Sequence, residues 1–65
     1  MFVRDYVNLQ EQEELDNQTF FLNTDTLGRC TLKSIEVLRS GGLWAIIEES
    51  DRKFYVQPWT KLNKV

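Results

Sequence analysis

The chain has no histidine and a single cysteine among its 65 residues. A zinc site needs several cysteine or histidine ligands, and a Ser-His or Cys-His nucleophile pair needs an imidazole, so neither is predicted. One thiol cannot form an internal disulfide, which favours a reducing, cytoplasmic setting. We interpret Cys30 as a small, partly buried residue of a strand.

Other catalytic and ligand-binding patterns are also missing. The three glycines, Gly28, Gly41 and Gly42, do not make a phosphate-binding loop. The carboxylates of residues 11–16 lack the spacing and the glycine of a calcium loop. Glu48 and Glu49 are adjacent, so on a strand they point to opposite faces and cannot act as a pair. The sequence therefore predicts a protein that is not an enzyme, with no catalytic residue, no metal and no cofactor.

No apolar run approaches the roughly 20 residues of a membrane span, and residues 1–5 lack the pattern of a signal peptide. We expect a soluble, cytoplasmic protein that does not contact a membrane. A hydrophobic content of 42% with 12% aromatic residues argues against intrinsic disorder. The length indicates a single domain, residues 1–65, with one small core.

Charge is unevenly distributed along the chain, although the net charge is only −2. Residues 1–26 carry one arginine against six acidic residues, a net −5, whereas residues 27–65 carry seven basic residues against four acidic ones, a net +3. Such a charge asymmetry can act as a dipole that steers a partner toward the protein. The alternative is the ordinary mixed surface of a soluble protein. For the acidic segment 11–16 the two interpretations are a solvated loop, which can include one helical turn, and a functional acidic patch.

Short segments of aromatic and β-branched residues predict β-strands joined by turns, with no convincing amphipathic helix. Alternation fails near Ser34, which predicts a β-bulge or bend there. The run Ser40-Gly41-Gly42 predicts a tight hairpin, and Gly28 is expected to take a positive φ. Pro58 should end the preceding strand. The predicted strands are residues 2–9, 18–24, 29–39, 43–50 and 54–57, followed by a 3₁₀ turn over 58–62 and an edge segment over 63–65.

Apolar residues occur on both faces of the segment 43–47, with Leu43, Ala45 and Ile47 on one face and Trp44 and Ile46 on the other. A strand of this kind is either central in a curled sheet or presents one face to a partner. Five strands of this length become stable when they curl into a small barrel. The predicted fold class is therefore all-β: a five-stranded small barrel or a strongly curled antiparallel meander, with a 3₁₀ turn near the C-terminus.

Residues 30–65 resemble the second half of an SH3-like small barrel of the Tudor or KOW kind. The likeness consists of an aliphatic strand leading into Gly41-Gly42, a strand and polar turn over 43–53, and a strand running into the tail 55–62. The resemblance implies a barrel closed by a 3₁₀ turn. It does not choose a function, because such barrels bind proteins, peptides and nucleic acids. An OB-like barrel and a simple meander stay as alternatives.

The best binding candidates are three aromatic residues, Trp44, Tyr55 and Trp59, with Arg52 and Lys53 as basic neighbours. Trp and Tyr are favoured anchors at protein interfaces, and they stack on bases when basic groups flank them. The alternative is that Trp44 and Trp59 close the ends of the core.

Three functions follow from these candidates. The first is a protein-binding module, an adaptor, inhibitor or small subunit that docks on a larger protein. Chain size alone adds a phage or mobile-element source to this expectation. The second is a nucleic-acid-binding barrel that uses the basic C-terminal half, against which the acidic net charge weighs. The third is a homo-oligomer formed through an exposed edge strand.

Overall fold

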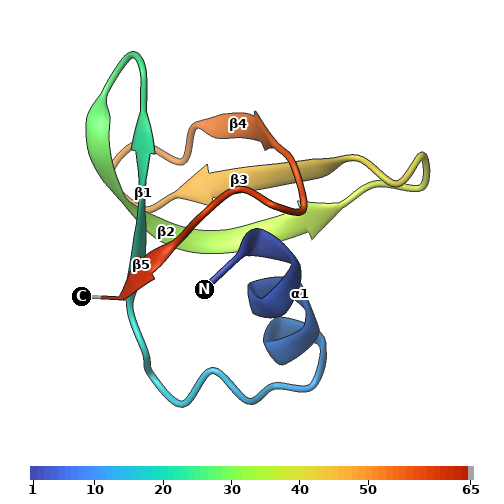
Figure 1. Cartoon of the computed structure of the whole chain (residues 1–65). Coiled ribbons are helices and arrows are strands. Elements are labelled where there is room, and N and C mark those ends of the chain that lie inside the picture. The colour runs from blue at the N-terminus through green and yellow to red at the C-terminus, as the bar shows by residue number, and fades with distance from the viewer. Residues whose placement is uncertain (65) are drawn as a thin grey trace.

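The computed structural model describes residues 1–64 and contains one helix followed by five strands (Figure 1). The strands form one antiparallel sheet in the order β4-β3-β2-β1-β5. The predicted edge segment 63–65 is observed as β5, and its last residue, Val65, lies outside the described residues. The elements are α1 (Val3–Glu11), β1 (Phe20–Thr24), β2 (Gly28–Val37), β3 (Leu43–Ile47), β4 (Lys53–Val56) and β5 (Asn63–Lys64).

The prediction of a strand over residues 2–9, with no amphipathic helix, is wrong, because this segment forms α1. Val3 and Tyr6 are buried on one helical face, and Val7 packs beside them at the next helical spacing. Asp5, which interrupts the strand-like alternation, is the third residue of the helix, and its carboxylate accepts the N–H of Phe2 at 3.2 Å. The aromatic and β-branched content favoured a strand, but burial of the helical face decided the structure.

The later strands lie where the sequence predicts them: β1, β2 and β3 are shorter than predicted, and β4 begins and ends one residue earlier. The register of β2 against β3 shifts between Leu32 and Ser34, which confirms the predicted bulge. In the β2–β3 hairpin Gly41 has φ +89°, and Gly28 at the start of β2 has φ +72°. These two positions use the conformational freedom of glycine.

The sheet is open, so the predicted barrel is not confirmed. The long strand β2 pairs with β1 through its first half, up to Thr31, and with β3 through its second half, from Leu32 onward. The bulge at the boundary lets the two halves turn away from each other, and Figure 1 shows β1 and β5 crossing the direction of β3 and β4. Strands β4 and β5 are the two ends of the sheet.

One apolar cluster fills the space between the two halves of the sheet and α1. Tyr6 meets Phe20 edge-on, with ring centroids 5.7 Å apart, and its burial raises the pKa of its hydroxyl. Cys30 is buried in β2, as expected for a small strand residue. The buried members are Val3, Tyr6, Phe20, Leu22, Cys30, Leu32, Ile35, Leu43, Ala45, Ile47, Val56 and Leu62.

The Gln10 side chain attaches α1 to β2 through hydrogen bonds of the kind that a neighbouring strand would make. The partners of β1 on β2 end at Thr31, so Ile35 lies beyond the reach of β1 on that side. The Gln10 amide donates to the Ile35 carbonyl at 2.7 Å and accepts the Ile35 N–H at 3.0 Å. Both backbone groups of Ile35 are thereby satisfied, which holds α1 below β2 in the view of Figure 1.

The segment between β4 and β5 is fixed by the start of the chain. Phe2 forms an antiparallel bridge with Lys61, and the N–H groups of Val3 and Arg4 donate to the carbonyls of Thr60 and Pro58 at 2.8 and 2.9 Å. The first N–H groups of a helix have no partner within the helix, so these carbonyls satisfy two of them. Residues 58–59 form a hydrogen-bonded turn, and the 3₁₀ turn predicted over 58–62 is not confirmed.

Candidate binding site

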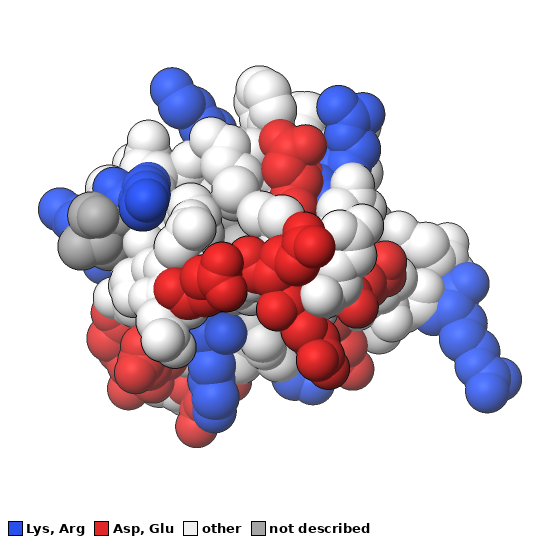
Figure 2. All heavy atoms as spheres, turned by 90° about the horizontal axis from the view of Figure 1, so that it is seen from below, with Lys and Arg blue, Asp and Glu red and all other residues white. Residues whose placement is uncertain are grey.

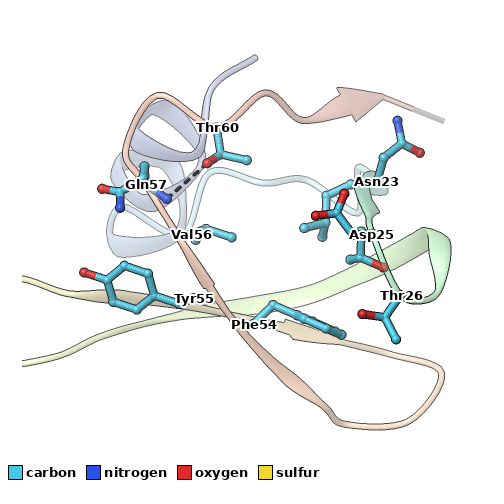
Figure 3. A pocket seen from close by; sticks show the side chains of 10 residues that line it. Asn23, Asp25, Thr26, Phe54, Tyr55, Val56, Gln57 and Thr60 are labelled. Carbon is cyan, nitrogen blue, oxygen red and sulfur yellow. Dashed lines mark hydrogen bonds between the residues drawn. The ribbon is translucent and has the colours of Figure 1, made fainter.

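A groove of about 300 Å³ lies between β4 and the end of β1 with the turn that follows it (Figure 3). Apolar side chains of Leu22, Phe54 and Val56 contribute to its lining, and Figure 3 shows Asn23, Asp25 and Thr26 on the wall opposite β4. This volume is at the lower end of the range for ligand pockets. The lining residues are Leu22, Asn23, Thr24, Asp25, Thr26, Phe54, Tyr55, Val56, Gln57 and Thr60.

The groove follows the edge of β4 and not one of its faces. Phe54 and Val56 pair with Ala45 and Leu43 and point toward the core side of the sheet, whereas Tyr55 points to the outer side with Trp44. Both sets line the groove, together with Gln57 just beyond the strand. Because consecutive side chains of a strand point to opposite faces, a surface that both sets share lies along the strand edge.

Two of the predicted binding residues pack against each other on the outer face of the sheet. Trp44 and Tyr55 are cross-strand partners, and their rings meet edge-on with centroids 5.6 Å apart. Trp44 is half-buried, and Tyr55 keeps 59% of its surface exposed. This outer face therefore presents the Tyr55 ring at the rim of the groove.

Trp59 is 71% exposed, so it does not close the end of the core. Its turn is held by two bonds between Gln57 and Thr60: the Thr60 N–H donates to the Gln57 carbonyl at 2.9 Å, and the Gln57 N–H donates to the Thr60 hydroxyl at 3.0 Å. Helix α1 holds the same turn from the other side through Arg4. A large apolar side chain is thus presented to solvent from a well-fixed backbone.

The two basic candidates differ in their surroundings. Lys53 lies on the outer face and forms an ion pair with Glu36 at 2.8 Å, whereas Arg52 is exposed in the turn before β4. Elsewhere Lys33 pairs with Asp51 at 2.8 Å, and the Asp51 carboxylate raises the pKa of the Lys33 ammonium. The guanidinium of Arg29 lies 3.6 Å from the centre of the Phe21 ring.

The predicted site residues are therefore only partly brought together. Trp44, Lys53 and Tyr55 share the outer face of β3 and β4, whereas Arg52 and Trp59 lie beyond opposite ends of β4. Asn23, Asp25 and Phe54, which line the groove, were not predicted. No local pattern marks them, because the groove forms only when residues 22–26 meet residues 54–60.

The acidic segment lies apart from the groove, at the bottom of the molecule as drawn in Figure 1. Glu11, Glu13, Glu14 and Asp16 are all exposed. Figure 2, which views the molecule from below, shows acidic side chains across the middle of that face and most basic side chains around them. The exposed carboxylates of residues 11–16 therefore lie on the lower face of the molecule, away from the groove.

Two ionisable side chains line the groove, Asp25 and Tyr55, together with the hydroxyl groups of Thr24, Thr26 and Thr60. An edge strand, a polar wall and exposed aromatic rings are suited to binding. Helix α1, the one helix of residues 1–64, is too short to cross a bilayer. Comparison of the chain with protein families, curated proteins and solved structures finds no match.

Proposed function

We propose that this protein is a non-enzymatic protein-binding module that docks on a larger protein as an adaptor, inhibitor or small subunit. The observation that carries the proposal is the exposure of Trp59 on a fixed turn and of Tyr55 on a paired strand that lines the groove. Exposed Trp and Tyr side chains on a rigid backbone are typical anchors of protein interfaces. The lone buried thiol fits a cytoplasmic setting, where it stays reduced.

The fold supports the same proposal in a more general way. The five strands, with a bulged β2 shared by both halves, agree with an open form of the SH3-like small barrel that residues 30–65 resemble. Small barrels of this kind carry binding sites on variable edges and loops. The groove between β4 and the β1–β2 turn is a site of that type.

Nucleic-acid binding is the alternative, and it has less support. Lys33 and Lys53, two of the basic residues on which it depends, are already paired with Asp51 and Glu36. A protein that contacts phosphates needs several cations on one surface, because these contacts dominate affinity. Arg39, Arg52, Lys61 and Lys64 stay available as exposed cations among the described residues.

Retention of partners from a lysate tests the proposal. Tagged protein is incubated with a cytoplasmic lysate, with and without nuclease, at low and high salt. We expect retention of one protein that survives nuclease and is lost with Trp59→Ala, whereas Val37→Ala, which trims another exposed apolar side chain, retains it. Both variants should keep the thermal midpoint of the wild type. Retention that nuclease or salt abolishes would instead support nucleic-acid binding, and no retention would refute both.

A further inference from the structure

The free edge of β4 presents specific backbone groups to the groove. The Ile47 N–H donates to the Arg52 carbonyl at 3.0 Å, so these two residues are a hydrogen-bonded pair of the β3–β4 ladder. Such pairs alternate along an antiparallel ladder, which assigns the backbone groups of Phe54 and Val56 to β3. The N–H and C=O of Lys53 and Tyr55 are consequently directed away from β3, to the edge.

Tyr55 is the residue whose edge groups lie beside the groove. Gln57, the next residue with the same orientation, already bonds through both its N–H and its C=O to Thr60. Within residues 1–64, β4 pairs with β3 and with no other strand. The N–H and C=O of Tyr55 therefore form an unused pair of strand hydrogen-bonding groups at the centre of β4.

The opposite wall is also an unpaired strand edge. On the side away from β2, β1 pairs with β5 through Phe20 and Phe21 alone. Leu22, Asn23 and Thr24 continue the pairing with β2 but have no described strand on their other side, and this is where they line the groove. The groove thus separates the two free edges of an open sheet.

We propose that this groove binds an extended peptide segment of the partner protein, which adds to β4 as a strand. The proposal rests on the protein-binding function above and specifies how the partner is bound. Strand addition supplies backbone hydrogen bonds for affinity and side-chain pockets for specificity. The peptide exchanges hydrogen bonds with Tyr55, places an apolar side chain over Phe54 and Val56, and carries a Lys or Arg beside Asp25.

The dimensions of the groove favour a single peptide chain over a second copy of the protein. The four residues of β4 match about 13 Å of extended chain. The turn that bears Asp25 and Thr26 stands opposite the β4 edge, where a whole second sheet would have to approach. At the other end of the sheet β5 has only two residues, which is too little for a stable head-to-tail strand pair.

The negative charge of the groove wall favours a peptide that carries a basic residue. Asp25 is the carboxylate of the groove, and neither ion pair of the described residues involves it. A basic residue in the peptide is therefore attracted to the wall, and an acidic one is repelled.

The first part of the test selects ligands with the full chain immobilised. The probe is a phage-displayed library of random linear peptides of about seven residues, long enough to extend past both ends of β4. We expect enriched peptides that alternate apolar with other residues, contain Lys or Arg, and lack a central proline. Enrichment of acidic or proline-rich peptides, or no enrichment, would overturn the proposal.

The second part measures amide hydrogen exchange in the wild-type protein with and without an enriched peptide. Binding should slow exchange at the Tyr55 amide at least about tenfold, because this N–H gains a partner. The Phe54 and Val56 amides, which already bond to β3, serve as internal controls and should change little. Unchanged exchange at Tyr55 in the bound state would refute strand addition, and this readout needs no variant.

The third part compares Tyr55→Pro with Tyr55→Thr. Both variants lose the ring, but only proline removes the edge N–H, and an edge strand tolerates proline when its N–H faces away from the sheet. We expect Tyr55→Pro to bind the peptide about tenfold more weakly than Tyr55→Thr. Asp25→Asn should weaken binding of the basic peptide about two- to fivefold, and less at high salt. Equal affinity of the two Tyr55 variants, with circular dichroism matching the wild type, would refute the proposal.

The outcomes separate this inference from the proposed function. One outcome is a lysate partner that depends on Trp59 and yet binds Tyr55→Pro and Tyr55→Thr with equal affinity. That result would support the proposed protein-binding function and refute strand addition at β4. Selected peptides that protect the Tyr55 amide, in a protein that retains nothing from a lysate, would support the groove as a peptide site and count against docking on a larger protein.

Discussion

At the level of single residues, the Gln10 side chain joins α1 to β2. Its amide bonds to both backbone groups of Ile35, in a part-buried position where β1 no longer reaches β2. Gln10→Ala should lower the free energy of unfolding by about 1–3 kcal/mol, since a buried N–H and C=O lose their partners. Urea denaturation followed by circular dichroism measures this change.

Two further substitutions make the Gln10 prediction specific. Gln10→Glu keeps an acceptor for the Ile35 N–H but loses the donor to the Ile35 carbonyl, so it should also destabilise the protein at neutral pH. Gln12→Ala removes an exposed glutamine just after the same helix and should change the stability by less than about 0.5 kcal/mol. Equal effects of the Gln10 and Gln12 substitutions would show that the contact with Ile35 does not stabilise the fold.

Glu49 gives a prediction about acid stability. Its carboxylate accepts the Thr31 N–H at 2.9 and 3.2 Å, and this hydrogen bonding lowers the pKa of Glu49 below its ordinary value. A lowered pKa in the folded state contributes stability above the ordinary pKa, and that contribution is lost as the pH falls through the lowered value. Glu49→Gln should therefore be less stable than the wild type at about pH 7 and indistinguishable from it at about pH 2.

Denaturation with urea at both pH values tests this prediction, with Glu14→Gln as the control at an exposed position outside the sheet. The control should show no such convergence. A Glu49→Gln variant that differs from the wild type by the same amount at both pH values would contradict the assigned hydrogen bond.

At the level of elements, α1 and the turn at residues 58–59 stabilise each other. Val3 has no exposed surface, and its N–H bonds to the Thr60 carbonyl. Val3→Ala should cost about 1–3 kcal/mol in stability, because it leaves a cavity under the helix. Val37→Ala makes the same substitution at a side chain that is 50% exposed and should cost much less. Thermal unfolding of the two variants compares them, and similar midpoints would contradict the docking of α1.

The sequence predicts the elements that depend on local signals. The bulge near Ser34, the Gly41 hairpin and the two-faced β3 were each predicted from residues close together in the chain, and each is observed. The helix was missed because Val3, Tyr6 and Val7 favour strands by propensity, whereas their helical spacing becomes decisive only when the helix can pack on a sheet.

The candidate site was likewise predicted only where single residues are informative, and not where it depends on the fold. The sequence singled out Trp59 and Tyr55 by residue type, and both are among the large apolar side chains left exposed. The groove depends on where β1 and β4 come to lie relative to each other, which no local pattern specifies. Asp25 was counted only as part of the acidic half, since nothing nearby in the sequence indicates a wall facing β4.

At the level of the whole molecule, the two free ends of the sheet raise the question of self-association. The wall opposite β4 and the brevity of β5 lead us to expect a monomer. Analytical ultracentrifugation should give about 7.7 kDa over a wide range of concentrations. A larger mass that falls to the monomer value with Tyr55→Pro, but not with Tyr55→Thr, would mean that a second copy occupies the β4 edge instead of a peptide.

The pairing of residues 1–3 with residues 60–62 also has a consequence for the order of folding during synthesis. Residues 1 and 3 are synthesised well before the residues they bond to, since Met1 pairs with Leu62 and Val3 with Thr60. The β2–β3 and β3–β4 hairpins can form while translation continues, because their partners are close in sequence. Helix α1 lacks its partners in residues 58–61 until these have been synthesised, and until it docks the nascent chain exposes the apolar surface that α1 later covers.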